Sequence, residues 1–132
     1  MIDIRLTPRK NPNNPEDKSK YYPAVVSKGE TSLDELTERI ARMSTLSKTD
    51  CIAVLTALVE LLPQELLQGR IVRLGNLGAF RLTVKGEGVD KPEAFTSETI
   101  KQIRLRFNPG TEIKKELLNA KFQLSTSTLE EV

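Results

Sequence analysis

The sequence predicts an α+β fold in which two helices precede an antiparallel sheet and a short helix follows it. Apolar residues recur at spacings of three and four between residues 33 and 67, which is the helical period. Between residues 72 and 107 they alternate with polar residues, which is the period of a strand. Helices and strands that occupy separate stretches of a chain are typical of α+β proteins.

Composition argues against several classes of function. The chain has no histidine, which removes the most common general base and the most common metal ligand. Its one cysteine, Cys51, cannot form an internal disulfide, and no apolar run approaches the roughly 20 residues of a membrane span. No signal peptide is evident at the N-terminus. We therefore expect a cytoplasmic protein that is not an enzyme, holds no metal or cofactor, and has no membrane or small-molecule partner.

Charge is distributed unevenly along the 132 residues. The net charge is +3 over residues 1–29, −4 over 30–69 and +4 over 70–106. We expect an N-terminal extension at 1–29, a folded domain at 30–122 and a disordered tail at 123–132. The segregation of basic residues is a sharper clue than the small total of +2.

The extension is predicted to contain at least one strand. Ile2, Ile4 and Leu6 alternate with polar residues, as a short strand requires. Prolines and asparagines then interrupt regular structure. The stretch from Tyr21 to Val26 could form a second strand, or one that pairs with the first.

Two helices are expected next. Ser32 and Glu35 have the spacing of a capping box, and the first helix should end near Met43. The second should begin after Ser47, and its apolar residues cover more than one face between Asp50 and Leu67. A helix this apolar is buried on more than one side, so we expect it to pack against a partner chain as well as its own domain.

The sheet is expected between residues 70 and 110. Apolar residues alternate with polar ones before and after a glycine corner at Gly75–Gly78. The apolar face of these strands should cover the helices. A third strand follows residue 100, and Asn108-Pro109-Gly110 predicts a turn into a last helix at about 111–119. Residues 122–124 could form a short strand.

The opposite side of the predicted strands holds only basic charges. These residues are Arg73, Arg81, Lys85, Arg104 and Arg106. A solvated sheet face is the plainer interpretation of this pattern. However, a face of like charges without acids repels itself, and a polyanion such as nucleic acid relieves that repulsion.

From Ser47 onward the sequence resembles the bacterial HU and integration-host-factor family of histone-like DNA-binding proteins. The family pattern is a long helix, then G-x-x-V-x-L-x-G-F-G-x-F, a basic β-arm and F-x-P-G-x-x-L-K. The matching residues are Gly69, Val72, Leu74, Asn76-Leu77-Gly78-Ala79-Phe80, Phe107-Asn108-Pro109-Gly110 and Ile113-Lys114. The resemblance covers about residues 30–120. The extension before them is similar to that of a longer HU-like subfamily.

The resemblance implies an intertwined homodimer whose sheet forms a saddle on double-stranded DNA and whose β-arm enters the minor groove. It also implies a histone-like, weakly sequence-specific architectural protein that condenses DNA in the bacterial nucleoid. The residues it places on DNA are Arg73, Arg81, Lys85, Lys91, Pro92, Arg104 and Arg106. The residues it places at the corner and the turn are Gly75, Gly78, Phe80, Phe107, Pro109 and Gly110. Gly78 is expected only to supply a backbone angle that other residues avoid.

The stretch Gly86–Thr99 departs from the family arm. Asp90-Lys91-Pro92 stands where the family carries an Arg-Asn-Pro tip, and four acids in the stretch would repel phosphates. Pro92 is interpreted either as a wedge between base pairs or as a loop proline. Residues 94–100 could form a short helical turn that truncates the arm. The alternative function is an HU-like fold used as a protein-interaction or assembly module with weak or no DNA binding.

Overall fold

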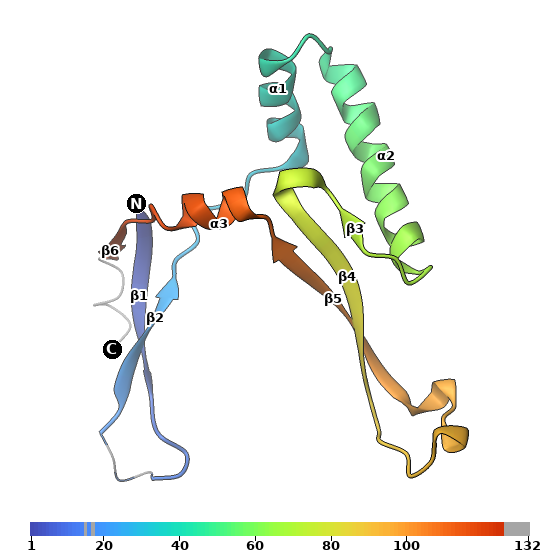
Figure 1. Ribbon diagram of the computed structural model, residues 1–132. Coiled ribbons are helices and arrows are strands. Elements are labelled where there is room, and N and C mark those ends of the chain that lie inside the picture. Colours follow the sequence, from blue (N-terminus) through green and yellow to red (C-terminus); the bar gives the residue numbers. More distant parts are fainter. Residues whose placement is uncertain (15, 17, 126–132) are drawn as a thin grey trace. The chain divides into compact units, whose positions relative to one another are not determined.

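The computed structural model describes residues 1–14, 16 and 18–125 (Figure 1). The chain divides into two compact units, which we call the terminal unit and the central unit. The terminal unit contains residues 1–32 and the chain from Leu117 onward, and the central unit contains Leu33–Glu116. Each unit has a three-stranded sheet, and the predicted α+β class is confirmed.

The sheet of the terminal unit is built from both ends of the chain. Strand β1 (Ile2–Arg9) pairs antiparallel with β2 (Lys20–Val25) and parallel with β6 (Phe122–Leu124), so β1 is the central strand. The predicted strands of the extension and the short strand near the C-terminus are thus confirmed. Strand β6 includes residues 123–124, the first two of the predicted tail, and residues 126–132 lie outside the described residues.

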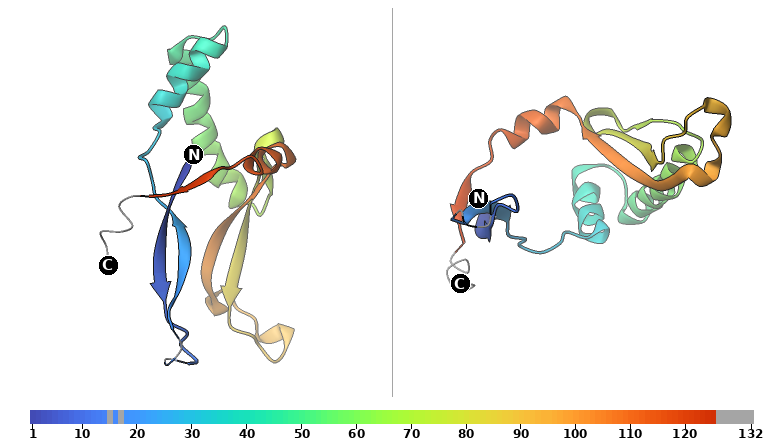
Figure 2. Two further views of the ribbon diagram at one scale, coloured as in Figure 1. Left: turned by 90° about the vertical axis from the view of Figure 1, so that its left-hand side faces the viewer. Right: turned by 90° about the horizontal axis from the view of Figure 1, so that it is seen from below.

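Two helices of the central unit lie side by side and are joined by a short loop (Figures 1 and 2). They are α1 (Leu33–Met43) and α2 (Lys48–Leu66). The hydroxyl of Ser47 accepts a hydrogen bond of 3.1 Å from the backbone N–H of Asp50, as a helix N-cap does. Cys51 is buried, which places the single thiol in the small core of this unit.

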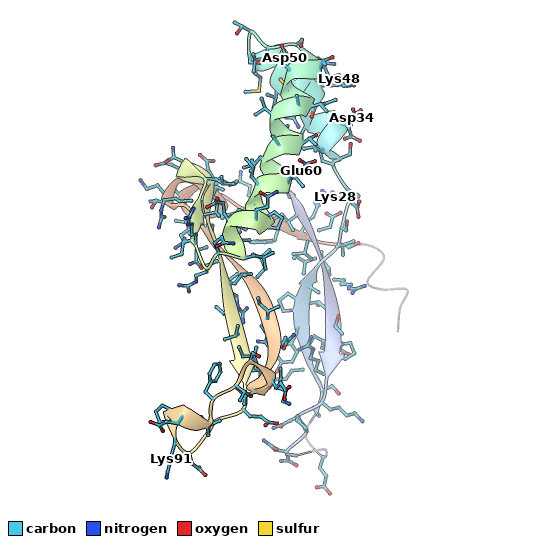
Figure 3. All side chains as sticks on the ribbon, turned by 90° about the vertical axis from the view of Figure 1, so that its right-hand side faces the viewer. Lys28, Asp34, Lys48, Asp50, Glu60 and Lys91 are labelled. Carbon is cyan, nitrogen blue, oxygen red and sulfur yellow. The ribbon has the colours of Figure 1, made fainter. Side chains whose placement is uncertain are left out.

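Lys48 connects the start of α2 to α1. Its Nζ lies 3.0 Å from Oε1 of Glu38 and 3.3 Å from Oδ1 of Asp34, and Figure 3 shows Lys48 close to Asp34. The hydrogen bond to Glu38 is the main cause that raises the pKa of Lys48, followed by the one to Asp34. Two acids of α1 therefore form ion pairs with the start of α2.

The central sheet has the strand order β3-β4-β5, and both pairings are antiparallel. Strand β3 (Val72–Arg73) is short, whereas β4 (Gly78–Gly86) and β5 (Ile100–Pro109) continue past it as a two-stranded ribbon (Figure 1). We call the ribbon beyond β3, with the turns that connect its strands, the arm. Helix α3 (Thr111–Leu117) follows β5 directly and is slightly shorter than expected.

The glycine corner and the turn before α3 are held together. A 3₁₀ turn over Gly75–Leu77 leads into β4, and the backbone N–H of Gly110 donates to the carbonyl oxygen of Leu77 at 3.0 Å. Gly78 has a φ of +138°, and a Cβ at this position would collide with the carbonyl oxygen of Asn108. The expectation that Gly78 supplies only a backbone angle is wrong, because the close approach of β5 also leaves no space for a side chain.

The end of the arm consists of two separate 3₁₀ turns, Pro92–Ala94 and Ser97–Thr99. The short helical turn considered for residues 94–100 is confirmed by the second of these turns, which follows Thr96. Phe95 and Thr96 have extended backbone angles, which ends the first turn before the second begins.

Few apolar side chains are buried. In the part of the chain that the structure describes, the buried apolar residues are Cys51, Leu66 and Ala79. Helix α2 contacts β3 and β4, yet Ile103 and Leu105 of β5 remain 57% and 55% exposed. The expectation that the strands cover the helices is thus correct near the corner but wrong along β5, because one chain does not supply enough helix surface to cover the whole apolar side.

Candidate nucleic-acid interface

One face of the central sheet carries all five predicted basic residues. We call this set the basic face: Arg73, Arg81, Lys85, Arg104 and Arg106. Arg81 lies directly opposite Arg106, and Arg104 lies opposite Thr83, two residues further along both strands. Alternate residues of a strand share a face, which adds Lys85, and the pairing of Arg73 with Ala79 adds the fifth member.

The basic face contains cations and neutral residues only. Its neutral members are Ala79, Thr83, Gln102 and Asn108. Like charges directly opposite each other in a sheet destabilise it, and Arg81 opposite Arg106 is such a pair. Among the described residues, no carboxylate forms an ion pair with any of the five cations. A bound polyanion would relieve the repulsion.

Arg104 is the most constrained member of the basic face. Its Nε and one terminal nitrogen donate hydrogen bonds of 3.2 Å and 3.0 Å to Oε1 of Gln102, two residues away on the same face. The side chain is only half-exposed, whereas the other four are exposed. Gln102 therefore fixes the orientation of the Arg104 guanidinium in the absence of a ligand.

Lys91 and Pro92 do not lie on the basic face. Lys91 lies at the end of the arm (Figure 3), and Pro92 opens the first 3₁₀ turn. The same segment contains four acids, of which Glu87 lies 3.8 Å from the ammonium of Lys101. The arm therefore combines a basic ribbon with a mixed-charge end.

Phe95 is a candidate contact that the sequence interpretation missed. It follows the first 3₁₀ turn of the arm and is 56% exposed. An exposed aromatic residue in a polar turn serves no core. A lone phenylalanine between two turn-forming stretches is the signal that would have identified it, and apolar wedges in minor-groove proteins include phenylalanine.

The corner and turn residues position the basic face rather than belong to it. Phe80 and Phe107 face each other across β4 and β5, with ring centroids 4.8 Å apart, on the side opposite the cations. Pro109 ends β5, and Gly110 closes the corner through its bond to Leu77. Gly75 is in the left-handed region, with a φ of +52°.

Other kinds of site are not found in the described residues. No group of three or more cysteine, aspartate and glutamate side chains is arranged to hold a metal ion. Across residues 1–125, apart from positions 15 and 17, no helix has both the length and the apolar character needed to cross a membrane. The basic face is thus the strongest candidate for function.

Fold and surface together define an α+β protein whose extended sheet presents a cationic face. A protein-family model described as "HU domain fused to wHTH, Ig, or Glycine-rich motif", HU-HIG, matches residues 1–124. The chain belongs to this family, which confirms the HU-like part of the resemblance.

A solved structure agrees with this assignment at the level of the fold. A candidate bacterial DNA-binding protein from Bacteroides vulgatus ATCC 8482 is similar to this chain, with a TM-score of 0.63 and 12% sequence identity. The match covers 93% of this chain and 47% of that one, so this chain spans about half the length of the other protein. No curated protein matched the sequence.

Proposed function

We propose that the protein is a dimeric, non-enzymatic architectural protein that binds double-stranded DNA in the bacterial nucleoid. The basic face contacts the phosphate backbone, and the arm follows the duplex into the minor groove. Membership of an HU-like family and the DNA-binding description of the Bacteroides vulgatus protein support this proposal. Their support is for DNA binding in general, and condensation and bending belong to the proposal.

The observation that carries the proposal is the acid-free grouping of five cations on one sheet face. Each cation that neutralises a phosphate releases condensed counterions, so such a face gains most of its affinity from the backbone of a polyanion. Arginines on a sheet face reach phosphates but are poorly placed to read major-groove edges. We therefore propose binding with weak sequence preference.

Dimerisation follows from the apolar surface that one chain leaves open. Val59, Leu61 and Leu67, on or directly after α2, are 61%, 53% and 73% exposed. Covering one leucine is worth about 1.5–3 kcal/mol, so this surface is costly in a monomer. A second copy would cover α2 and the open apolar side of β5.

Neutralising two cations of the basic face tests the proposal. In R81A/R104A, the slope of log DNA affinity against log salt should become shallower. The change should be about 0.9 for each phosphate that is no longer neutralised. R39A/R42A removes the same charge from exposed positions of α1 and is the matched control. Fluorescence anisotropy on a labelled duplex at several salt concentrations measures both, and an R81A/R104A variant with the parent's salt dependence would contradict the proposal.

A protein-interaction module is the second candidate function. The acids Glu87, Asp90, Glu93 and Glu98 near the arm end favour it, because they oppose phosphate binding there. Absence of duplex binding by the parent protein at low salt would reject the DNA proposal and favour this alternative.

A further inference from the structure

The β1–β2 hairpin of the terminal unit carries a second group of neighbouring cations. In the register of β1 and β2, Arg9 lies directly opposite Lys20, so two like charges again face each other across an antiparallel pair. In the part of the chain that the structure describes, no carboxylate forms an ion pair with either residue. Among the described residues, nothing of opposite charge offsets the repulsion between Arg9 and Lys20.

These cations line a concavity at the end of the hairpin with a volume of about 420 Å³. Arg9, Lys10, Lys18 and Lys20 contribute four positive charges to its wall. Glu16 is a described acid of the connecting loop, and it does not line the concavity. The wall thus presents several positive charges to one open space, as binding to a chain of linked phosphates requires.

Neutral side chains also belong to the wall, and two of them, Asn11 and Tyr22, form interactions there. The guanidinium of Arg9 lies over the ring of Tyr22, 5.9 Å from its centroid, which restrains the arginine. The side-chain oxygen of Asn11 accepts a hydrogen bond of 3.0 Å from the backbone N–H of Asn13 and stabilises the turn that follows Lys10. The cations are thus mounted on a shaped hairpin rather than on an extended segment.

We propose that this concavity is a second binding site for the sugar-phosphate backbone of double-stranded DNA. The inference rests on the proposed function, because the duplex is taken to be the polyanion that the basic face also binds. Two cationic surfaces on one chain raise affinity by effective concentration, since binding at one surface makes binding at the other intramolecular. The hairpin strengthens DNA binding without being essential to it.

Neutralisation of Lys10 and Lys18 tests the second site. In K10Q/K18Q, the negative slope of log affinity against log salt should become shallower by about 2 to 4 for a dimer. The change is roughly 0.9 for each phosphate that is no longer neutralised. K10R/K18R keeps the charges and should retain the parent's slope. R39Q/R42Q is the control for a change in net charge and should alter the slope by less than one. Both lysines are exposed, so thermal unfolding should be unchanged.

The outcomes separate this inference from the proposed function. If the parent binds DNA and K10Q/K18Q has the parent's slope, the second site is refuted and the basic face stands. The second site would also be refuted if the slope became equally shallow in K10Q/K18Q and in K10R/K18R, because a structural change would then be the cause. If the parent binds no duplex at low salt, the proposed function fails and the second site fails with it.

Discussion

At the scale of single residues, two neighbouring features of the central sheet have different roles. Arg81 and Arg106 face each other, a like-charged pairing that costs stability, and we propose that they serve binding rather than folding. Gly78 and Gly110 sit where the corner meets the turn, and they allow the strands to approach closely. Gly78 and Gly110 thus help to position the strands that carry Arg81 and Arg106.

Gly78→Ala should destabilise the protein by about 1–3 kcal/mol through its positive φ alone, and by more because the new Cβ meets the carbonyl oxygen of Asn108. Gly88→Ala is the matched control, since no atom lies within 4 Å of a Cβ built there. Chemical denaturation measures both. Equal stability of the two variants would show that the corner is not constrained as described.

Phe95→Ala should reduce the bend that the protein induces in DNA more than it reduces affinity, because an exposed wedge acts on base stacking rather than on phosphates. Pro92→Ala, at the start of the first 3₁₀ turn of the same arm, separates the two wedge candidates. Energy transfer between dyes at the ends of a short duplex reports the bend. Bending that persists in both single variants and in the double variant would rule out an apolar wedge in this arm.

At the scale of elements, long periodic segments were predictable, whereas the turns of the arm were predictable only in part. The apolar spacing and Ser47 predict α2 closely, because helix period and capping act within one turn of the chain. The end of the arm contains no periodic pattern, and its two 3₁₀ turns depend on local backbone bonds instead. The crowding at Gly78 was equally invisible, because it comes from Asn108, which is distant in the sequence.

The helix pair should lose stability at high pH through Lys48. Its pKa is raised above the ordinary 10.5 by Glu38 and Asp34, so its contribution is complete below pH 10.5 and disappears as the pH rises through the higher folded value. Lys48→Met should therefore be less stable than the parent at neutral pH, and the difference should shrink above pH 10.5. Thermal unfolding at a series of pH values measures it, and a difference that is constant with pH would contradict this role.

At the scale of the whole molecule, the chain exposes more surface than compact units of its mass, and we propose that a second copy covers part of it. Its accessible surface is 11509 Å², whereas two compact units sharing its mass of 14.8 kDa would expose roughly 8,000 Å² together.

The residues of the basic face could be identified from the sequence, because strand alternation assigns each residue to one side of the sheet. The hairpin concavity could not, since the pairing of Arg9 with Lys20 depends on the register of β1 and β2.

The protein should be a dimer at micromolar concentration, and its unfolding temperature should rise with protein concentration, because folding and association are linked when one chain leaves its core open. Sedimentation equilibrium and thermal unfolding over a wide range of concentration measure both properties. A stable folded monomer with a concentration-independent unfolding temperature would disprove the dimer.

The salt dependence of duplex binding tests the central claim most directly. With roughly three to five phosphate contacts from each basic face of a dimer, the two basic faces should together contribute about −5 to −9 to the slope of log affinity against log salt. The slope should be the same for duplexes of unrelated sequence, because phosphates carry the contacts. A slope near zero, or tight binding to one sequence alone, would contradict a protein that holds DNA through the cations of its sheet.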